Sequence, residues 1–319
     1  MRKAGICLMI VASMISVSYA QSTKKGYPKE STKKNLNAAE RLRPIDMETL
    51  KSALGMEGQE KDGQFKVTIP QNDLDVVVDG FKIIPPMGLG SWVAFGPTRG
   101  EPMIMGDVVV TEKDLKPVQQ EVIRQGLTVT GIHNHFVRNE PNVMYMHIGG
   151  RGNEEKLAKS VKAIFDMVAE IRGANPSKPE SPKVENTLDT AMIDSILGYK
   201  GTMNNGVYKI TIGRPDIDLR EDGAPVSTFL GFNTWASWQG TPEKAAVAGD
   251  FTMTADEVEP VIQALVENGI EVVAVHNHMV HESPRIFFLH YWGIEQAEKL
   301  AMGLRAALNK TGVKKNKKP

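Results

Sequence analysis

The chain has 319 residues with 38 basic and 38 acidic side chains, and this zero net charge gives no electrostatic reason to expect a nucleic-acid partner. Its length allows one large or two medium domains with a sizeable core. Its one cysteine, Cys7, falls within the N-terminal segment described next, so the mature chain is expected to hold no disulfide and no thiolate metal site. Any metal must therefore be held by His, Asp or Glu.

The first 20 residues have the pattern of a secretory signal peptide. Arg2 and Lys3 precede a mostly apolar stretch, and Ser18-Tyr19-Ala20 is a small-x-small cleavage site. We therefore expect cleavage after Ala20, a secreted or periplasmic location and no membrane anchor in the mature chain. Residues 21–44 are polar and indicate a flexible lead-in, and the basic tail 310–319 indicates a solvated end.

From residue 45 onward the chain is a tandem duplication with a constant offset of 143 residues, as from position 133 to position 276. We place repeat 1 at 45–171, a proline-containing linker at 172–187 and repeat 2 at 188–309. The period is far longer than the roughly 20–50 residues of a solenoid and indicates a duplicated domain. Matched pairs include Lys66-Val67-Thr68-Ile69 with Lys209-Ile210-Thr211-Ile212, Asp79-Gly80 with Asp222-Gly223, Trp92 with Trp235, and Gly106-Asp107 with Gly249-Asp250.

Each repeat predicts the same series of elements in chain order. A short helix ends at a glycine, Gly55 or Gly198, and three strands follow. These strands are 65–69, 91–95 and 103–110 in repeat 1, and 207–212, 234–238 and 246–253 in repeat 2. Next come an amphipathic helix (255–268 in repeat 2, with Thr254 as N-cap), two further strands and a closing helix (154–171 and 295–308).

The fold class that we predict from this series is α+β. It is a tandem duplication of an αβββαββα-type unit, with mainly antiparallel sheets and helices on one face. We expect the two copies to be related by a pseudo-two-fold axis.

The strongest functional signal is that six of the seven histidines fall in two matched triplets. His133-Asn134-His135 and His276-Asn277-His278 each end an apolar strand, and His147 and His290 follow twelve positions after the second histidine of each pair. Residues i and i+2 of a strand point to the same face, so the histidines of each pair project together. Three imidazoles from two strands suit a divalent metal, with Zn favoured and Cu, Fe or Ni also compatible. The sequence leaves open whether the triplets form two sites or one composite site.

Carboxylates could complete such a site. For a general base, the loops offer Glu140 and Glu282. Asp107 and Asp250 are matched, and each could be a further ligand, a hydrogen-bond partner of a ligating histidine, or a turn residue. The seventh histidine, His281, is another candidate ligand or second-layer partner.

Two other matched residue types have simpler interpretations. We expect Asn134 and Asn277 to cap the strand ends through side-chain-to-backbone hydrogen bonds. We expect Trp92 and Trp235 to be core residues.

The repeated pattern resembles a bacterial family named after the mycobacterial lipoproteins LppY and LpqO. The resemblance covers nearly all of residues 45–309, and repeat 2 carries it best, in Gly249-Asp250-Phe251, His276-Asn277-His278 and Pro284-Arg285. Repeat 1 departs at Glu140-Pro141-Asn142, where asparagine stands in place of arginine. The resemblance implies a tandem domain of unknown function and supplies no reaction. Lipid anchoring is not implied, because this chain lacks a lipobox.

Three functions are compatible with the sequence. The first is an exported protein with one or two His-rich divalent-metal sites, including a metal-dependent hydrolase acting on a small-molecule or peptide ligand. The second is a non-catalytic module that binds a ligand or a metal. The third is a duplicated structural domain whose histidines form a hydrogen-bonded core network.

Overall fold

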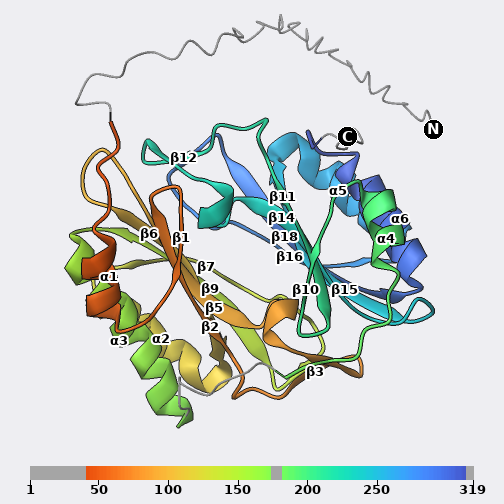
Figure 1. Cartoon of the computed structure of the whole chain (residues 1–319), viewed down its shortest axis with the longest axis horizontal. Helices are drawn as coiled ribbons and strands as arrows, with labels where there is room; N and C mark the ends of the chain where they lie inside the picture. Colours follow the sequence, from red (N-terminus) through yellow and green to blue (C-terminus); the bar gives the residue numbers. More distant parts are fainter. Residues whose placement is uncertain (1–40, 174–181, 314–319) are drawn as a thin grey trace, which may run out of the picture. The chain divides into compact units, whose positions relative to one another are not determined.

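The computed structural model describes residues 41–173 and 182–313, which belong to one compact unit spanning Ala38–Pro319 (Figure 1). The predicted signal peptide, residues 21–40 of the lead-in, the middle of the linker and the end of the basic tail lie outside the described residues. Within the two described ranges, no helix combines the length and the apolar character that a membrane crossing requires.

Each repeat forms one six-stranded antiparallel sheet, and the two sheets have the same strand order. The first main sheet consists of β1 (Gln59–Lys61), β2 (Gln64–Pro70), β5 (Gly90–Gly96), β6 (Met103–Thr111), β9 (Val143–Arg151) and β7 (Thr128–His133), in that order. The second consists of β10 (Thr202–Asn204), β11 (Val207–Gly213), β14 (Asn233–Gly240), β15 (Ala245–Thr254), β18 (Ile286–Glu295) and β16 (Glu271–His276). The predicted α+β duplication with antiparallel sheets is confirmed.

Each repeat contains three helices. They are α1 (Met47–Leu54), α2 (Glu112–Arg124) and α3 (Glu154–Arg172) in repeat 1, and α4 (Thr190–Leu197), α5 (Ala255–Glu267) and α6 (Ala297–Leu308) in repeat 2. The predicted N-cap Thr254 is confirmed, because it forms a capping box with Glu257 at the start of α5. Gly55 and Gly198 end α1 and α4 in the left-handed conformation, which glycine adopts without steric cost.

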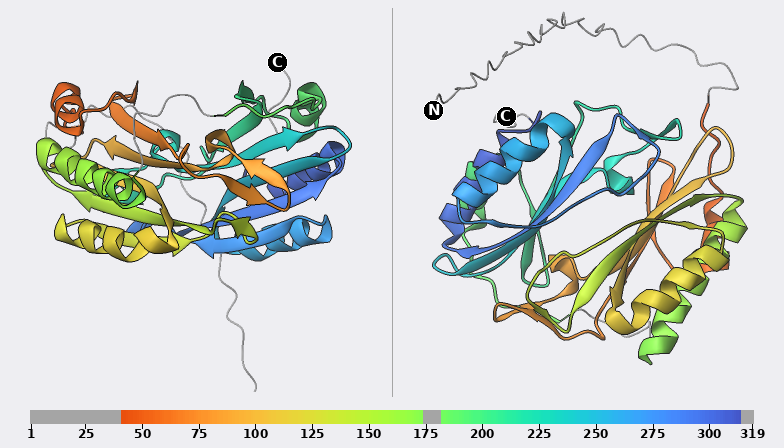
Figure 2. Two further views of the ribbon diagram at one scale, coloured as in Figure 1. Left: turned by 90° about the horizontal axis from the view of Figure 1, so that it is seen from below. Right: turned by 180° about the vertical axis from the view of Figure 1, so that it is seen from behind.

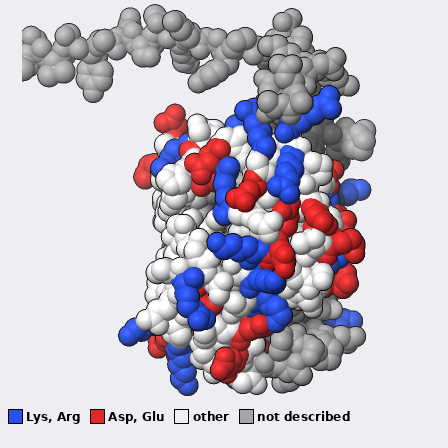
Figure 3. All heavy atoms as spheres, turned by 90° about the vertical axis from the view of Figure 1, so that its left-hand side faces the viewer, with Lys and Arg blue, Asp and Glu red and all other residues white. Residues whose placement is uncertain are grey.

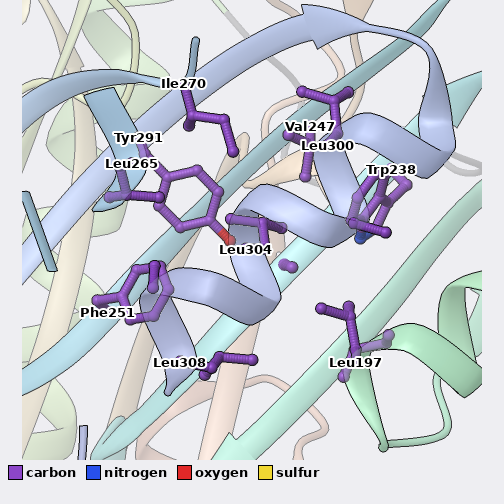
Figure 4. Close-up of a cluster of buried hydrophobic side chains, with 14 of the residues drawn as sticks. Leu197, Trp238, Val247, Phe251, Leu265, Ile270, Tyr291, Leu300, Leu304 and Leu308 are labelled. Carbon is purple, nitrogen blue, oxygen red and sulfur yellow. The ribbon is translucent and has the colours of Figure 1, made fainter. Parts of the chain in front are cut away.

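The helices of each repeat cover one face of that repeat's own sheet (Figure 2). In repeat 2 this core is built around Trp238 and Tyr291, which are almost fully buried against α6 residues such as Leu300 and Leu304 (Figure 4). The opposite face of each main sheet, which we call the inner face, is left for other contacts.

Two short sheets that the sequence analysis omitted cover part of the inner faces. They are β4 (Phe81–Ile83), β3 (Val76–Val78) and β8 (Asn139–Glu140) in repeat 1, and β13 (Ala224–Pro225), β12 (Arg220–Glu221) and β17 (Glu282–Ser283) in repeat 2. Each contains a tight Asp-Gly turn in which Asp79 or Asp222 adopts φ 47°. A 3₁₀ turn follows in each repeat, η2 (Pro85–Met87) and η3 (Thr228–Leu230).

These short sheets, which we call the arms, are exchanged between the repeats. Val76 and Val78 of the repeat 1 arm pack with Ala246, Ala248 and Trp292 of the second main sheet. Reciprocally, the repeat 2 arm packs on the first main sheet, where Leu219 and Ala224 contact the cluster that includes Ala94 and Met105. The indole nitrogen of Trp292 donates a hydrogen bond to Asp79 Oδ2 at 3.0 Å. Each repeat therefore completes the core of the other.

The surface on the side of α1 and α3 shows basic and acidic side chains interspersed, without a broad field of either sign (Figure 3). Neighbouring ion pairs such as Lys159 with Glu155 and Lys162 with Asp166 on α3 account for part of this pattern. This face offers no basic stripe of the kind that tracks a nucleic-acid backbone.

Candidate metal centre

Register across each main sheet places the matched Trp, Asp and third histidine on one row. Trp92 pairs with Asp107, and Asp107 pairs with His147. In repeat 2 the same row runs from Trp235 through Asp250 to His290. Cross-strand partners share a face of the sheet, so all these side chains project from the inner faces. The glycine before each aspartate is needed because a Cβ at Gly249 would lie 2.2 Å from the carbonyl oxygen of Trp235.

The two His-Asn-His strands, β7 and β16, meet where the inner faces of the repeats come together. Asn277 donates side-chain hydrogen bonds to the carbonyl oxygens of Thr130 and Met279, each at 2.8 Å. The Thr130 hydroxyl donates to the carbonyl oxygen of His278 at 2.7 Å. A side chain at Gly131 would lie 2.8 Å from the carbonyl oxygen of Asn277, so glycine permits the close approach. The predicted side-chain-to-backbone bonding of Asn277 is confirmed, and it also links the repeats.

This crossing brings all six histidines of the two triplets into one group, which we call the histidine cluster. The rings of His133 and His276 stack with centroids 3.7 Å apart. The ring centroids of His135 and His290 are 3.8 Å apart, and those of His147 and His278 are 3.7 Å apart. Each of these three pairs joins the two repeats. The question that the sequence left open is answered in geometric terms: the triplets converge on one composite group.

Several sets of nitrogen and oxygen atoms in the cluster lie close enough to share one metal ion. The ligand atoms of His133, His276 and His290 lie within 4.8 Å of one another. Two further sets meet the same limit, namely His147 with His276 and His278, and Asp107 with His133 and His147. The Nε2 atoms of His133 and His147 are 2.6 Å apart. These groups could hold a metal ion, and the first two draw ligands from both repeats.

The cluster is buried, and many of its polar atoms lack partners. His147 and His290 have exposed fractions of 1% and 2%. Among the described residues, no hydrogen-bond partner is found for Nε2 of His135, His276, His278 or His290. Nδ1 of His147 and His290 faces the carbonyl oxygens of Gly106 and Gly249 at 3.3 and 3.0 Å, a contact that orients each ring and leaves Nε2 for a ligand. Buried, unpaired polar atoms are costly, and a bound ion would satisfy them.

Burial also fixes the protonation state of the imidazoles. It lowers the pKa of His133 to about 3 and, together with neighbouring histidines, lowers the pKa of the other five well below the ordinary value. The neutral imidazole favoured in this way is the form that binds metals.

Asp107 and Asp250 are buried in the middle of β6 and β15, so their interpretation as turn residues is wrong. Asp107 places its carboxylate oxygens 3.6 Å from His135 Nε2 and 3.5 Å from His147 Nδ1. Asp250 lies 3.7 Å from His278 Nε2 and 4.0 Å from His276 Nε2. Burial raises the pKa of Asp107 to about 8 and raises that of Asp250 well above its ordinary value. Both carboxyls belong to the histidine cluster.

The other candidates lie away from the cluster. Glu140 is exposed on β8 and pairs with Val77. Glu282 is on β17 and forms an ion pair with Arg285 at 2.9 Å. His281 is exposed in the loop before β17, and its backbone N–H donates to Glu221. Among the described residues, none of the three has a contact with the histidine cluster. The reason is that both glutamates sit in the arm strands, which the sequence analysis did not foresee.

A pocket of about 400 Å³ leads to the cluster. It extends from exposed residues of β1, such as Lys61, to His135, His278 and His290, and both aspartates line it. Trp92 and Trp235 form part of its wall and are only partly buried, so their prediction as plain core residues is wrong. The tips of these indoles pack against glycines of the opposite repeat, Gly231 and Gly88.

Sequence reasoning also missed Lys66 and Lys209, which line the same pocket. Their ammonium nitrogens lie 4.4 Å from the ring centre of Trp92 and 4.1 Å from that of Trp235. The available signal was a lysine at the same position of both repeats within a mainly apolar strand.

For the metal-free protein, we expect the free energy of unfolding to be greatest near pH 6.5. Unfolded histidines take up protons below about pH 6.5, whereas folded His133 does so only near its pKa of about 3, so stability falls as the pH drops through this window. Asp107 has the opposite effect on stability. In the folded state it keeps its proton up to about pH 8, whereas in the unfolded state it loses the proton near pH 4. Its contribution to the free energy of unfolding therefore falls as the pH rises from about 4 to 8.

Urea unfolding between pH 4 and pH 9 measures this profile. Asp107→Asn should flatten the decline on the alkaline side. A stability that stays constant between pH 6.5 and pH 5 would contradict the burial of neutral imidazoles.

Comparison with known proteins identifies the repeated unit. The family described as Domain of Unknown Function (DUF1259) matches residues 48–167 and again residues 191–310. The chain belongs to this family. The tandem domain of unknown function that the resemblance implied is thereby confirmed, while the name LppY/LpqO-like stays a resemblance. No curated protein matches the chain.

Among solved structures, the chain is similar to a double ringed trimeric shell protein from the RMM microcompartment. The identity is 12% and the TM-score is 0.19, over 67% of this chain and 82% of that one. A similarity this low carries no structural or functional argument.

Proposed function

We propose that this protein is an exported metal-dependent hydrolase whose single metal centre is composite, with ligands from both repeats. The observation that carries the proposal is the set His133, His276 and His290, whose ligand atoms lie within 4.8 Å of one another although they come from different repeats. The unpartnered Nε2 atoms of the cluster support it. Export is supported by the signal-peptide pattern of the first 20 residues.

Zinc is the ion that we favour. Neutral imidazole nitrogens, with a carboxylate oxygen from Asp107 or Asp250, are ligands that zinc prefers, and the part of the chain that the structure describes contains no cysteine. Copper, iron and nickel also accept such ligands, so the identity of the ion needs measurement.

Hydrolysis is supported by the pocket beside the cluster. A zinc ion with an open position lowers the pKa of a bound water to about 7. Asp107 and Asp250 line the pocket and adjoin the histidines. A cation bound among the histidines would favour the ionised carboxylate, and we assign the role of general base to one of these aspartates in place of Glu140 and Glu282.

A non-catalytic metal-binding module is the second candidate. The observation that favours it is the number of donors, because six histidines and two aspartates are enough to fill every position around an ion. Structural zinc sites are closed in this way, whereas catalytic sites keep one position open.

The test of the composite centre is metal content by mass spectrometry on untagged mature protein. Wild type is compared with the double variants His133→Ala/His135→Ala and His276→Ala/His278→Ala. Because both pairs belong to one centre, each variant should reduce the bound metal to nearly zero. The matched control His281→Ala should leave metal content unchanged, since His281 is exposed and outside the cluster.

The alternatives give different numbers. If the repeats held two independent sites, each double variant would lose about half of the metal that wild type binds. Absence of metal from wild type, even after reloading, would overturn the proposal. If metal is bound but phosphoester, ester and peptide substrates show no turnover that a chelator abolishes, the protein is the non-catalytic module.

A further inference from the structure

Lys66 and Lys209 are an unexplained pair of cations beside the histidine cluster. They occupy matched positions on β2 and β11, and both line the pocket that contains His135, His278 and His290. Each ammonium lies over the indole of its own repeat, and Lys66 also lies 5.1 Å from the ring centre of Phe229. Contact with aromatic faces holds a cation in place and leaves its N–H donors available for another partner.

The charge of this pair is not neutralised by the protein around it. Among the described residues, no carboxylate oxygen lies within 4.0 Å of either ammonium, whereas five other lysines have such partners. Burial lowers the pKa of both lysines to about 8, and mutual repulsion contributes for Lys66, so both remain mainly charged at neutral pH. Holding two half-buried cations in one pocket is costly unless an anion joins them.

The nearby aspartates do not serve as that anion. Asp107 and Asp250 face the histidines at 3.5 to 4.0 Å. Asp250 attracts Lys209, but from beyond ion-pair distance. The two lysine charges therefore remain for a ligand.

We propose that the pocket binds a small substrate through a dianionic phosphoryl group held between Lys66 and Lys209, with the rest of the molecule lying along Trp92 and Trp235 toward the histidine cluster. Two ammonium groups match the charge of a phosphate monoester better than that of a single carboxylate, and lysine is a common point-charge partner of phosphate. The volume of about 400 Å³ is in the range of small-molecule sites. Calling the ligand a substrate rests on the proposed hydrolase function, whereas anion binding by the lysines does not require the metal.

The experiment is calorimetric titration with inorganic phosphate at constant ionic strength, on the metal-loaded protein and on the metal-stripped protein. Wild type should bind phosphate in both forms. Lys66→Met/Lys209→Met keeps the aliphatic stems but removes both charges, and it should weaken binding at least about tenfold in both forms while leaving metal content unchanged. The control Lys159→Met/Lys162→Met makes the same change in net charge on α3, outside the pocket, and should bind phosphate like wild type.

Each outcome decides between the proposals. Phosphate affinity that is unchanged in Lys66→Met/Lys209→Met overturns the anion site. Lysine-dependent binding in a protein that never binds metal supports the anion site and rejects the metal centre. Acetate binding as tightly as phosphate, with the same lysine dependence, would make the ligand a carboxylate and overturn the phosphoryl assignment.

Two measurements avoid dependence on the fold of the double variant. The single variants Lys66→Met and Lys209→Met should each weaken phosphate binding by at least about threefold. Phosphate should raise the Tm of wild type, whereas chloride at equal ionic strength should not. If the single variants bind phosphate like wild type and phosphate does not raise the Tm, the proposal is overturned even if the double variant does not fold.

Discussion

Neither repeat is expected to fold when it is produced without the other. Residues 41–173 alone would lose the repeat 2 partners of six side chains in and beside the arm, all with exposed fractions of 0 to 1% in the whole chain: Val76, Val78, Ile83, Ile84, Met87 and Phe136. Burial of each such side chain contributes about 1.5–3 kcal/mol. The loss over six residues is comparable with the whole stability of a typical domain, about 5–15 kcal/mol.

Circular dichroism and urea unfolding of the fragments 41–173 and 182–313 measure this effect. Each fragment alone should lack a cooperative transition. The two fragments produced together should assemble in a 1:1 ratio and unfold cooperatively, which serves as the control for fragment design. A cooperative transition in either isolated fragment would show that the exchanged arms are not needed for folding.

Removal of the metal that we propose is expected to have the second large effect, a fall in Tm of about 10 °C. A ligand present at about a thousand times its Kd stabilises the folded state by about 4 kcal/mol. For a domain of this size, each kcal/mol changes Tm by about 2–4 °C. Removal also leaves the Nε2 atoms of His135, His276, His278 and His290 buried and without a partner, which is costly.

Differential scanning calorimetry with and without a chelator measures this fall. Readdition of zinc should restore the original Tm, and other divalent ions should restore it to different extents. His276→Ala/His278→Ala provides the control, because a protein without the centre should not respond to the chelator. An unchanged Tm in wild type would favour the hypothesis that the histidines form only a hydrogen-bonded core network.

Much of the fold could be predicted because its signals are local. Periodicity and capping residues predicted α3 and α5 and the long strands, and the offset between the copies predicted the duplication. The arm strands escaped prediction because they are two or three residues long. Strands that short carry no periodicity, although the turns at Asp79-Gly80 and Asp222-Gly223 were visible in the sequence.

The site was predicted in part, because some of its signals are also local in the sequence. The histidines were found because their number and spacing are unusual in one chain. Lys66 and Lys209 were missed because a lysine in a strand is ordinarily exposed, and only the partner repeat encloses it in a pocket. Glu140 and Glu282 were proposed from closeness in sequence, but the arm strands hold them away from the cluster.

The sequence alone determined the duplicated α+β unit and the two histidine triplets, because each depends on neighbours in the chain or on an exact repeat. Tertiary structure decided that the triplets converge, that Asp107 and Asp250 join them, and that the lysines share their pocket. These relations depend on how two inner faces pack across the contact between β7 and β16. No sequence period encodes that packing, because it results from the exchange of buried surface between segments more than a hundred residues apart.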